Sequence, residues 1–169
     1  MEMRFMERAI ELARQGSAGP FGCVIVKDGR IVGEGYARVF EDCDPTAHGE
    51  VVALRAAAKQ LGTHDLSGCE VYNIAVSCPM CMAALYWARV ARLYYCCVPE
   101  DAAALGFANL DLERELRKPL EERALAALQI AELRPAALDA YRDYLRRPGS
   151  VVQSATPSRS TTTLRSTHP

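Results

Sequence analysis

Three residues in the middle of this chain have side chains that bind zinc well. They are His48, Cys78 and Cys81, and two residues separate the two cysteines. A catalytic zinc usually has three protein ligands and leaves its fourth coordination position to water. Glu50 follows His48 by two residues, so it would lie close to the metal and remain free to move protons. The residue types and their spacing therefore predict a catalytic zinc centre with Glu50 as its proton carrier.

Each part of this pattern also has a structural explanation. A Cys-x-x-Cys sequence alone is compatible with a redox pair or with part of a four-ligand structural zinc site. A single histidine at a helix start is more often a cap or a packing residue than a metal ligand. The combination favours catalysis, because no second Cys-x-x-Cys pair could complete a structural site and because such a site has no use for Glu50. A His-x-Glu sequence followed by a distant Cys-x-x-Cys is also the signature of zinc-dependent deaminases.

Two helices and one strand are expected to bring these side chains together. The apolar run 51–58 predicts a helix that begins near His48 and ends near 61–62. A second apolar run predicts a helix over 78–89. The strand predicted for 70–76 leads directly to the first cysteine. The two helix N-termini would then meet at one ion, where their positive dipole ends favour cysteine thiolates.

The other patterns along the chain predict an α/β fold. Asp28 and Gly29 between two apolar runs are a strong signal for a β-hairpin. Short helical patterns around Gly106 are expected to form a lid over the site. We therefore expect a three-layer α/β/α sandwich with a five-stranded mixed sheet and helices on both faces. The further elements expected are a helix at 4–15, strands at 23–26, 31–33, 93–98 and 128–133, short helices within 99–118 and a helix at 136–146.

Composition and charge limit the classes of protein that this chain can be. Of its 169 residues, 50% are hydrophobic, which indicates one globular domain over residues 1–147. Residues 148–169 are rich in Ser, Thr, Pro and Arg, and we expect them to be a disordered tail. The net charge of −1 gives no electrostatic reason to expect nucleic acid or an anionic membrane as a partner. We find no apolar run that could span a bilayer and no signal-peptide pattern, and seven cysteines, an odd number, indicate the reducing cytoplasm.

With these motifs together, the chain resembles the cytidine deaminase-like superfamily and, within it, the small bacterial guanine deaminases. The resemblance covers residues 4–146. It implies a five-stranded sheet flanked by helices, one zinc ion per subunit and a homodimer. Guanine deaminases of this kind exchange C-terminal segments between subunits, so the resemblance includes such an exchange among the arrangements open to this chain. The segments on which it rests are 19–22, 24–29, 44–48, 78–81, 86–89 and 106–107.

The resemblance also implies a reaction, the hydrolytic removal of an amino group from a heterocyclic base. Water activated by zinc attacks the carbon that bears the amine, while Glu50 takes a proton from that water and passes it to a ring nitrogen. Glu50 then protonates the amine, which leaves as ammonia. By the family pattern Phe21 would stack on the base, with core packing as the alternative, whereas Trp87 and Phe107 are expected to be wall and packing residues. The substrate pocket that the resemblance implies consists of Phe21, Ala37, Ala47, Ser77, Trp87, Phe107 and Asn109.

Several positions depart from the family pattern. Ala37 stands where the family usually has an Asn that binds the substrate, and Ser77 stands where it usually has Pro. Asn109 stands where the small guanine deaminases have an acidic residue, and an Asn cannot relay a proton as a carboxylate can. Gly49 replaces the usual Ala between the histidine and the glutamate, as it does in fungal-type cytosine deaminases. We therefore expect an intact catalytic core and a changed pocket, which would accept a guanine-like or other aminated heterocyclic base.

Two other functions remain open at this point. A tRNA adenosine deaminase shares the zinc motif, but it needs a basic surface to hold RNA. The net charge and the small size of the arginine patch at 142–147 disfavour it. A catalytically inactive deaminase fold that serves as a binding subunit would explain Ala37 and Asn109. The retention of Glu50 beside three complete ligands argues against that alternative.

Overall fold

The computed structural model describes residues 2–107 and 110–153. Within this part of the chain the residues form two compact units, one that contains the chain up to Cys96 and one that begins at Cys97. The predicted pocket residue Asn109 and most of the predicted tail, from residue 154 onward, lie outside the described residues. No described helix is both long enough and apolar enough to cross a membrane.

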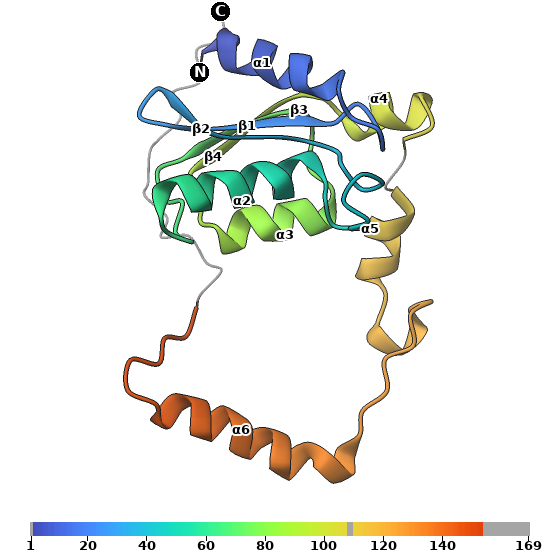
Figure 1. Cartoon of the computed structure of the whole chain (residues 1–169). Coiled ribbons are helices and arrows are strands. Elements are labelled where there is room, and N and C mark those ends of the chain that lie inside the picture. Colours follow the sequence, from blue (N-terminus) through green and yellow to red (C-terminus); the bar gives the residue numbers. More distant parts are fainter. Residues whose placement is uncertain (1, 108–109, 154–169) are drawn as a thin grey trace, which may run out of the picture. The chain divides into compact units, whose positions relative to one another are not determined.

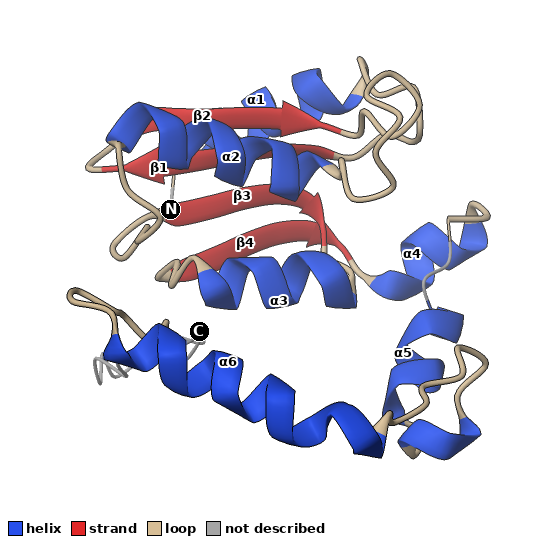
Figure 2. Ribbon diagram, turned by 60° about the horizontal axis from the view of Figure 1, so that its bottom comes forward, coloured by secondary structure: helices blue, strands red, loops and turns tan. Residues whose placement is uncertain are grey.

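A mixed β-sheet of four strands is the centre of the first unit (Figure 2). The strands are β1 (Gly22–Lys27), β2 (Arg30–Tyr36), β3 (Glu70–Ala75) and β4 (Arg92–Cys97), and they lie in the order β2-β1-β3-β4. β1 pairs antiparallel with both β2 and β3, whereas the arrows of β3 and β4 in Figure 2 run in the same direction. The predicted hairpin is confirmed, because Asp28 and Gly29 both have the positive φ, 50° and 72°, that tight hairpin turns require.

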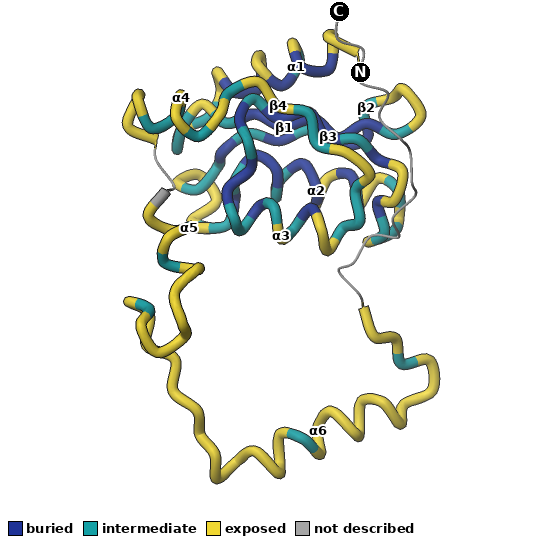
Figure 3. The backbone as a smooth tube through the Cα atoms, turned by 180° about the vertical axis from the view of Figure 1, so that it is seen from behind, coloured by how far each residue is buried: buried dark blue, intermediate teal, exposed yellow. Residues whose placement is uncertain are grey.

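Helices cover both faces of this sheet in Figure 1. α1 (Met3–Ala13) lies on one face, while α2 (Gly49–Leu61) and α3 (Pro79–Trp87) lie on the other. Each of these helices was predicted to within about two residues of its observed bounds. The buried residues gather in the sheet and on the inward sides of the helices, as the dark segments of Figure 3 show.

The central strand β1 contributes to the core on both sides of the sheet. Side chains along a strand point alternately to opposite faces. Val24 and Val26 accordingly pack in one apolar cluster with residues of α1, whereas Cys23 and Ile25 pack in another with residues of α2 and α3. β1 is therefore buried on both faces, which explains why its sequence is apolar without interruption.

Two glycines in β2 let α2 lie directly on the sheet. A Cβ atom at Gly35 would lie 2.6 Å from the backbone nitrogen of Ala53, and one at Gly33 would lie 2.8 Å from that of Ala57. Real Cβ atoms do not approach the backbone this closely, so a larger residue at either position would push the helix away from the strand. This backbone contact fixes the height of α2 above the sheet and, with it, the place of the residues at its N-terminus.

The described part of the second unit is helical and irregular. Its helices are α4 (Pro99–Ala104), α5 (Leu110–Arg117), two short 3-10 helices at 120–122 and 131–133, and α6 (Arg134–Arg146). The predicted terminal helix and the predicted short helices within 99–118 are therefore confirmed. From Cys97 to Gln153, none of the side chains that the structure describes is buried. This unit has no apolar core of its own among those residues.

The fifth strand predicted for residues 128–133 is wrong. Residues 128–130 have no regular structure, and Ala131–Leu133 form a 3-10 helix that leads into α6. Ala131 and Glu132 are poor strand formers, and Pro135 in the first turn of α6 favours the start of a helix. The sheet accordingly has four strands within the described residues instead of the five that were expected.

Candidate metal centre

His48 and Cys78 occupy equivalent positions in two helices. Each is an N-cap residue with extended backbone, His48 (φ −71°, ψ 155°) of α2 and Cys78 (φ −63°, ψ 165°) of α3. Their carbonyl oxygens accept early helical hydrogen bonds, from Val52 N at 3.0 Å and from Met82 N at 2.8 Å. Neither side chain caps its helix, so both side chains are available to a metal. Pro79 supports the start of α3, because its fixed φ suits the first helical position.

The three predicted metal ligands come together. The ligand atoms of His48, Cys78 and Cys81 all lie within 4.8 Å of one another, and Cys78 Sγ is 3.7 Å from His48 Nδ1. Zinc bonds of about 2.3 Å to sulfur and about 2.0 Å to nitrogen in a tetrahedron place such atoms roughly 3.6 Å apart. An imidazole with two thiolates is also a donor set that suits zinc. The residues present therefore fit a zinc ion, and three ligands leave a tetrahedral ion one further position.

The two cysteines of this group differ in how readily they lose the thiol proton. A hydrogen bond with Cys81 is the main reason that the pKa of Cys78 is lowered to about 4, and His48 acts in the same direction. The same hydrogen bond, together with burial, raises the pKa of Cys81. The pKa of His48 is raised chiefly by its hydrogen bond with Cys78. At neutral pH the group therefore holds a thiolate at Cys78 and a thiol at Cys81, and zinc binding would displace the remaining thiol proton.

Glu50 lies in the first turn of α2 and is only 4% exposed. Its Oε1 accepts a hydrogen bond of 2.8 Å from Nδ2 of Asn73, a buried residue of β3. The same nitrogen donates to the carbonyl oxygen of Ala75 at 2.8 Å and lies 3.5 Å from Oγ of Ser77. Sequence reasoning missed Asn73, although an amide between the apolar residues of this strand was a signal that could have revealed it.

Four of the predicted pocket residues, Phe21, Ala37, Ala47 and Ser77, lie in the loops around the metal ligands. Two of them directly precede a ligand in the sequence, and hydrogen bonds between loops hold the others. The N–H of Ala37 donates to the carbonyl of Phe21 at 3.0 Å, and the N–H of Arg38 donates to the carbonyl of Ala47 at 2.9 Å. Ala37 and Ala47 are buried, and Phe21 is half-buried. Ser77, also buried, directly precedes the first cysteine ligand. The loops before β1, after β2 and before α2 therefore meet at one place.

The other three predicted pocket residues have different surroundings. Trp87 is the last residue of α3, about 13 Å along the helix axis from Cys78 at the usual rise per residue, and its side chain is half exposed. Phe107 belongs to the second unit, where it is exposed. Asn109 lies outside the part of the chain that the structure describes.

Gly49, found where the resemblance led us to expect alanine, has a steric role. A Cβ atom at this position would lie 2.6 Å from the carbonyl oxygen of Phe21. The loop before β1 therefore packs directly on the N-terminus of α2, between the metal ligand and Glu50. Glycine is the residue that permits this contact without a shift of the loop.

Comparison with known proteins adds four similarities. Residues 1–97 match the profile of the cytidine and deoxycytidylate deaminase zinc-binding region. The chain is 45% identical over 130 residues to the guanine deaminase of Bacillus subtilis (strain 168), which covers 75% of this chain and 83% of that protein. An X-ray structure of guanine deaminase from Bacillus subtilis superposes with a TM-score of 0.82 at 38% identity, over 89% of this chain and 99% of that chain. A tRNA-specific adenosine deaminase of Agrobacterium fabrum is 43% identical over 96 residues, 54% of this chain and 62% of that protein.

Proposed function

This chain belongs to the family of the cytidine and deoxycytidylate deaminase zinc-binding region, and we propose that it removes the amino group of a free guanine-like or other aminated heterocyclic base as ammonia. The observation that supports this most directly is the group of His48, Cys78 and Cys81 with the buried carboxylate of Glu50 two residues after His48. A relative named guanine deaminase, which matches 75% of this chain, supports a free base as the substrate.

Glu50 is the proton carrier in this proposal. Zinc held by His48, Cys78 and Cys81 would supply the Lewis acid that makes water nucleophilic at neutral pH. The Glu50 carboxylate would accept one proton from the attacking water and deliver it to a ring nitrogen. It would then accept the second proton of that water, from the hydroxyl group of the adduct, and deliver it to the amine, which leaves as ammonia. Burial of Glu50 excludes bulk water, so the protons pass between the substrate and one carboxylate instead of exchanging with solvent.

The proposed pocket includes residues that differ from the family pattern. Ala37 offers no polar side-chain atom, and Ser77 offers a hydroxyl where a proline was expected. Phe21 would stack on the base, Ala47 would line the wall beside His48, and Trp87, Phe107 and Asn109 complete the proposed set. A pocket with fewer polar groups at Ala37 would bind the sugar-free base less specifically, so small rings such as aminopyrimidines and aminotriazines are included among the proposed substrates.

A tRNA adenosine deaminase is the second candidate, because the relative from Agrobacterium fabrum has that name. Two of the three arginines that could form a basic patch at 142–147 are paired with carboxylates. Arg142 contacts Asp139 at 2.7 Å, and Arg146 contacts Asp143 at 2.8 Å. These ion pairs lower the positive potential that phosphate binding requires. We therefore prefer a free base to tRNA as the proposed substrate.

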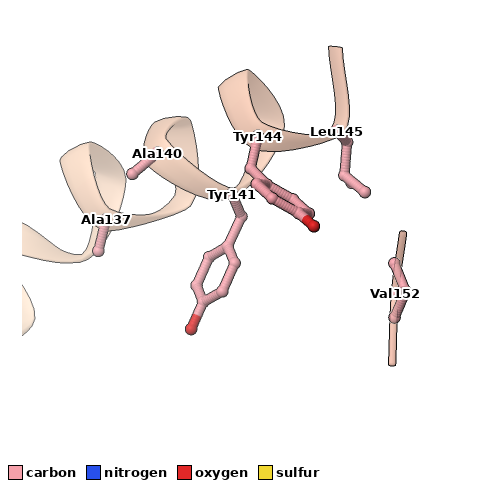
Figure 4. Close-up of a pocket in the computed structure, with 6 residues that line it drawn as sticks. All are labelled: Ala137, Ala140, Tyr141, Tyr144, Leu145 and Val152. Carbon is pink, nitrogen blue, oxygen red and sulfur yellow. The ribbon is translucent and has the colours of Figure 1, made fainter. Parts of the chain in front are cut away.

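We also propose a homodimer, with exchange of C-terminal segments as one form of it. The second unit exposes large apolar side chains, among them Leu125 at 82%, Leu128 at 89% and Tyr141 at 71%. A soluble monomer rarely leaves so many apolar residues in water. On α6, several exposed apolar side chains line a hollow of about 540 Å³, which Figure 4 shows. Its lining residues are Ala137, Ala140, Tyr141, Tyr144, Leu145 and Val152.

Three further expectations stay proposals. All seven cysteines are free thiols, which supports the reducing cytoplasm as the location. A catalytic domain over residues 1–147 followed by a separate tail over 148–169 remains the proposed domain organisation. The three-layer sandwich is supported by helices on both faces of the sheet.

The proposed function is tested by ammonia release from a panel of aminated heterocycles. The panel contains guanine, cytosine, isocytosine, adenine, 8-substituted guanines, aminotriazines and the matching nucleosides, each with zinc-loaded protein. We expect release from at least one free base, and we expect Glu50→Gln to lower kcat by about 10²–10⁴-fold, the usual contribution of a general acid–base group. Zinc content of each variant is measured in parallel.

Glu7→Gln, a change on an exposed residue of α1, is the matched control and should keep full activity. Release of ammonia that is unchanged in Glu50→Gln would contradict the role given to Glu50. No release from any compound at one bound zinc per chain would favour the inactive binding subunit instead. Salt-sensitive binding and deamination of tRNA would favour the second candidate.

A further inference from the structure

The amide of Asn73 is buried in the middle of the sheet. The residue is 2% exposed, lies in β3 and pairs across the sheet with Cys23 of β1. Placing an amide in such an apolar environment is unfavourable unless hydrogen bonds compensate for the lost water. The partners of this amide therefore indicate why an Asn is present.

Both short partners of Asn73 are pure acceptors. Nδ2 lies 2.8 Å from Oε1 of Glu50 and 2.8 Å from the carbonyl oxygen of Ala75. A carboxylate and a carbonyl can only accept, so the amide nitrogen, and not its oxygen, must face them. The two hydrogens of Nδ2 are thereby used, and the amide cannot rotate without losing one bond.

These hydrogen bonds connect the two chain segments that provide the predicted metal ligands. Glu50 belongs to the first turn of α2, close to His48, whereas Ala75 and Ser77 belong to the segment that leads to Cys78. Asn73 contacts both, since Ser77 Oγ also lies 3.5 Å from Nδ2. The amide therefore sets the Glu50 carboxylate relative to the segment that delivers the sulfur ligands.

The oxygen of Asn73 points to a role beyond packing. Among the side chains that the structure describes, Asn73 Oδ1 is the buried polar atom without a hydrogen-bond partner. An amide retained only for the stability of the sheet would be expected to satisfy both of its ends, because an unpaired buried acceptor is costly. The Nδ2 end of the amide has its hydrogen-bond partners, and one of them is Glu50, whereas Oδ1 has none.

We propose that Asn73 is a positioning residue for Glu50. Its Nδ2 holds Glu50 Oε1 by a charge-assisted hydrogen bond, fixes a side chain that otherwise rotates about three bonds, and leaves Oε2 to exchange protons with water and substrate. Asn73 itself does not contact the substrate. This inference rests on the proposed function, because it assigns Glu50 the role of proton carrier.

Kinetics of three variants test the proposal. Asn73→Leu removes the amide and keeps a side chain of similar size that suits the apolar surroundings. We expect its kcat to fall about 10–100-fold, as for loss of a residue that orients a metal-site group, with KM changed less than about twofold and one zinc per chain. Asn73→Thr returns a hydroxyl donor on a strand-forming residue and should recover part of kcat. Tyr72→Phe, which removes two partly buried hydrogen bonds of the neighbouring residue of β3, is the control and should leave kcat unchanged.

A second measurement does not depend on turnover. The side-chain amide of Asn73, observed by nitrogen-15 NMR, should show slowly exchanging, well-separated protons in both metal-free and zinc-loaded protein. Glu50→Gln should shift these signals, whereas Glu7→Gln should not. If the wild type releases no ammonia, the proposed function fails, while this spectrum still decides whether Asn73 holds Glu50.

The outcomes that overturn the proposal are distinct. A kcat of Asn73→Leu within about twofold of wild type at full zinc loading would show that the amide does not position Glu50. A loss confined to KM would make Asn73 a substrate contact. If Asn73→Leu does not fold, the kcat of Asn73→Thr and the NMR spectrum of the Asn73 amide test the proposal instead. An amide spectrum that Glu50→Gln leaves unchanged would refute it. In a Glu50→Gln background, Asn73→Leu should cause no further loss, and an additive loss would contradict a shared role.

Discussion

One carboxylate holds the turn that precedes the metal ligand His48. Asp44 Oδ1 accepts hydrogen bonds from Thr46 N at 2.8 Å and from Thr46 Oγ1 at 2.6 Å. Arg55 donates to the other oxygen at 3.0 Å. These contacts, with the Thr46 hydroxyl as the largest cause, lower the pKa of Asp44 from 3.8 to about 2. A group whose pKa is depressed in the folded state stabilises that state above its unfolded pKa and loses this effect as the pH falls.

We therefore expect Asp44 to contribute fully to stability above about pH 4 and to lose this contribution as the pH falls from about 4 through about 2. Asp44→Asn keeps an oxygen that can accept from Thr46 and removes the charge. Its melting temperature should lie below that of the wild type near pH 6, and the two should converge between about pH 4 and pH 2. Glu7→Gln serves as the control. A difference between wild type and Asp44→Asn that stays constant with pH would refute this role of the charge.

The reactive residues were predictable because their types and local spacing determine the chemistry. His48, Cys78 and Cys81 are a zinc donor set wherever two helix N-termini bring them together, and Glu50 lies in the first turn of the first of these helices. Asn73 was not predictable in the same way. Its partner is 23 residues away in sequence, and the contact depends on how β3 lies relative to α2. A sequence pattern does not show which of two residues so far apart along the chain lie close together in space.

At the level of elements, the packing of α2 on β2 decides where His48 and Glu50 lie. Gly35→Ala would place a methyl group against the backbone of Ala53. We expect this substitution to lower the free energy of unfolding by about 1–3 kcal/mol, the usual cost of overpacking. Arg30→Ala, at the exposed start of the same strand, should change it by less than about 0.5 kcal/mol. Urea denaturation of both variants measures the difference, and equal stabilities would mean that the helix moves freely.

The elements of the first unit could be predicted because their patterns are local. The hairpin at Asp28 and Gly29, the three helices and the strands around the metal centre all have apolar periodicity or turn residues that distinguish them. The segment 128–133 has neither feature. It is a short, mainly apolar run, so helix and strand are hard to separate by composition, and the proline at 135 favours a helix.

For the whole molecule, the exposed apolar surface of the second unit is the feature that calls for a partner. Tyr141 and Leu145 line the same hollow of α6 and are both well exposed. We expect the double variant Tyr141→Ser with Leu145→Ser to shift the wild-type dimer towards monomer in sedimentation velocity. Arg134→Gln, at the start of the same helix, is the control and should stay dimeric. A wild type that sediments as a monomer at all concentrations would refute the proposed dimer.

The backbone contact between β2 and α2 also affects how this protein tolerates sequence drift. Gly33 and Gly35 hold the helix through main-chain atoms, so its outward residues, such as Ala56 and Lys59, have little influence on where it lies. Neutral changes can accumulate on that outer surface while the reactive groups keep their places. A substitution at either glycine, in contrast, would shift the helix or strain its contact with the strand. Lineages that share this contact can therefore diverge in surface properties without rebuilding their chemistry.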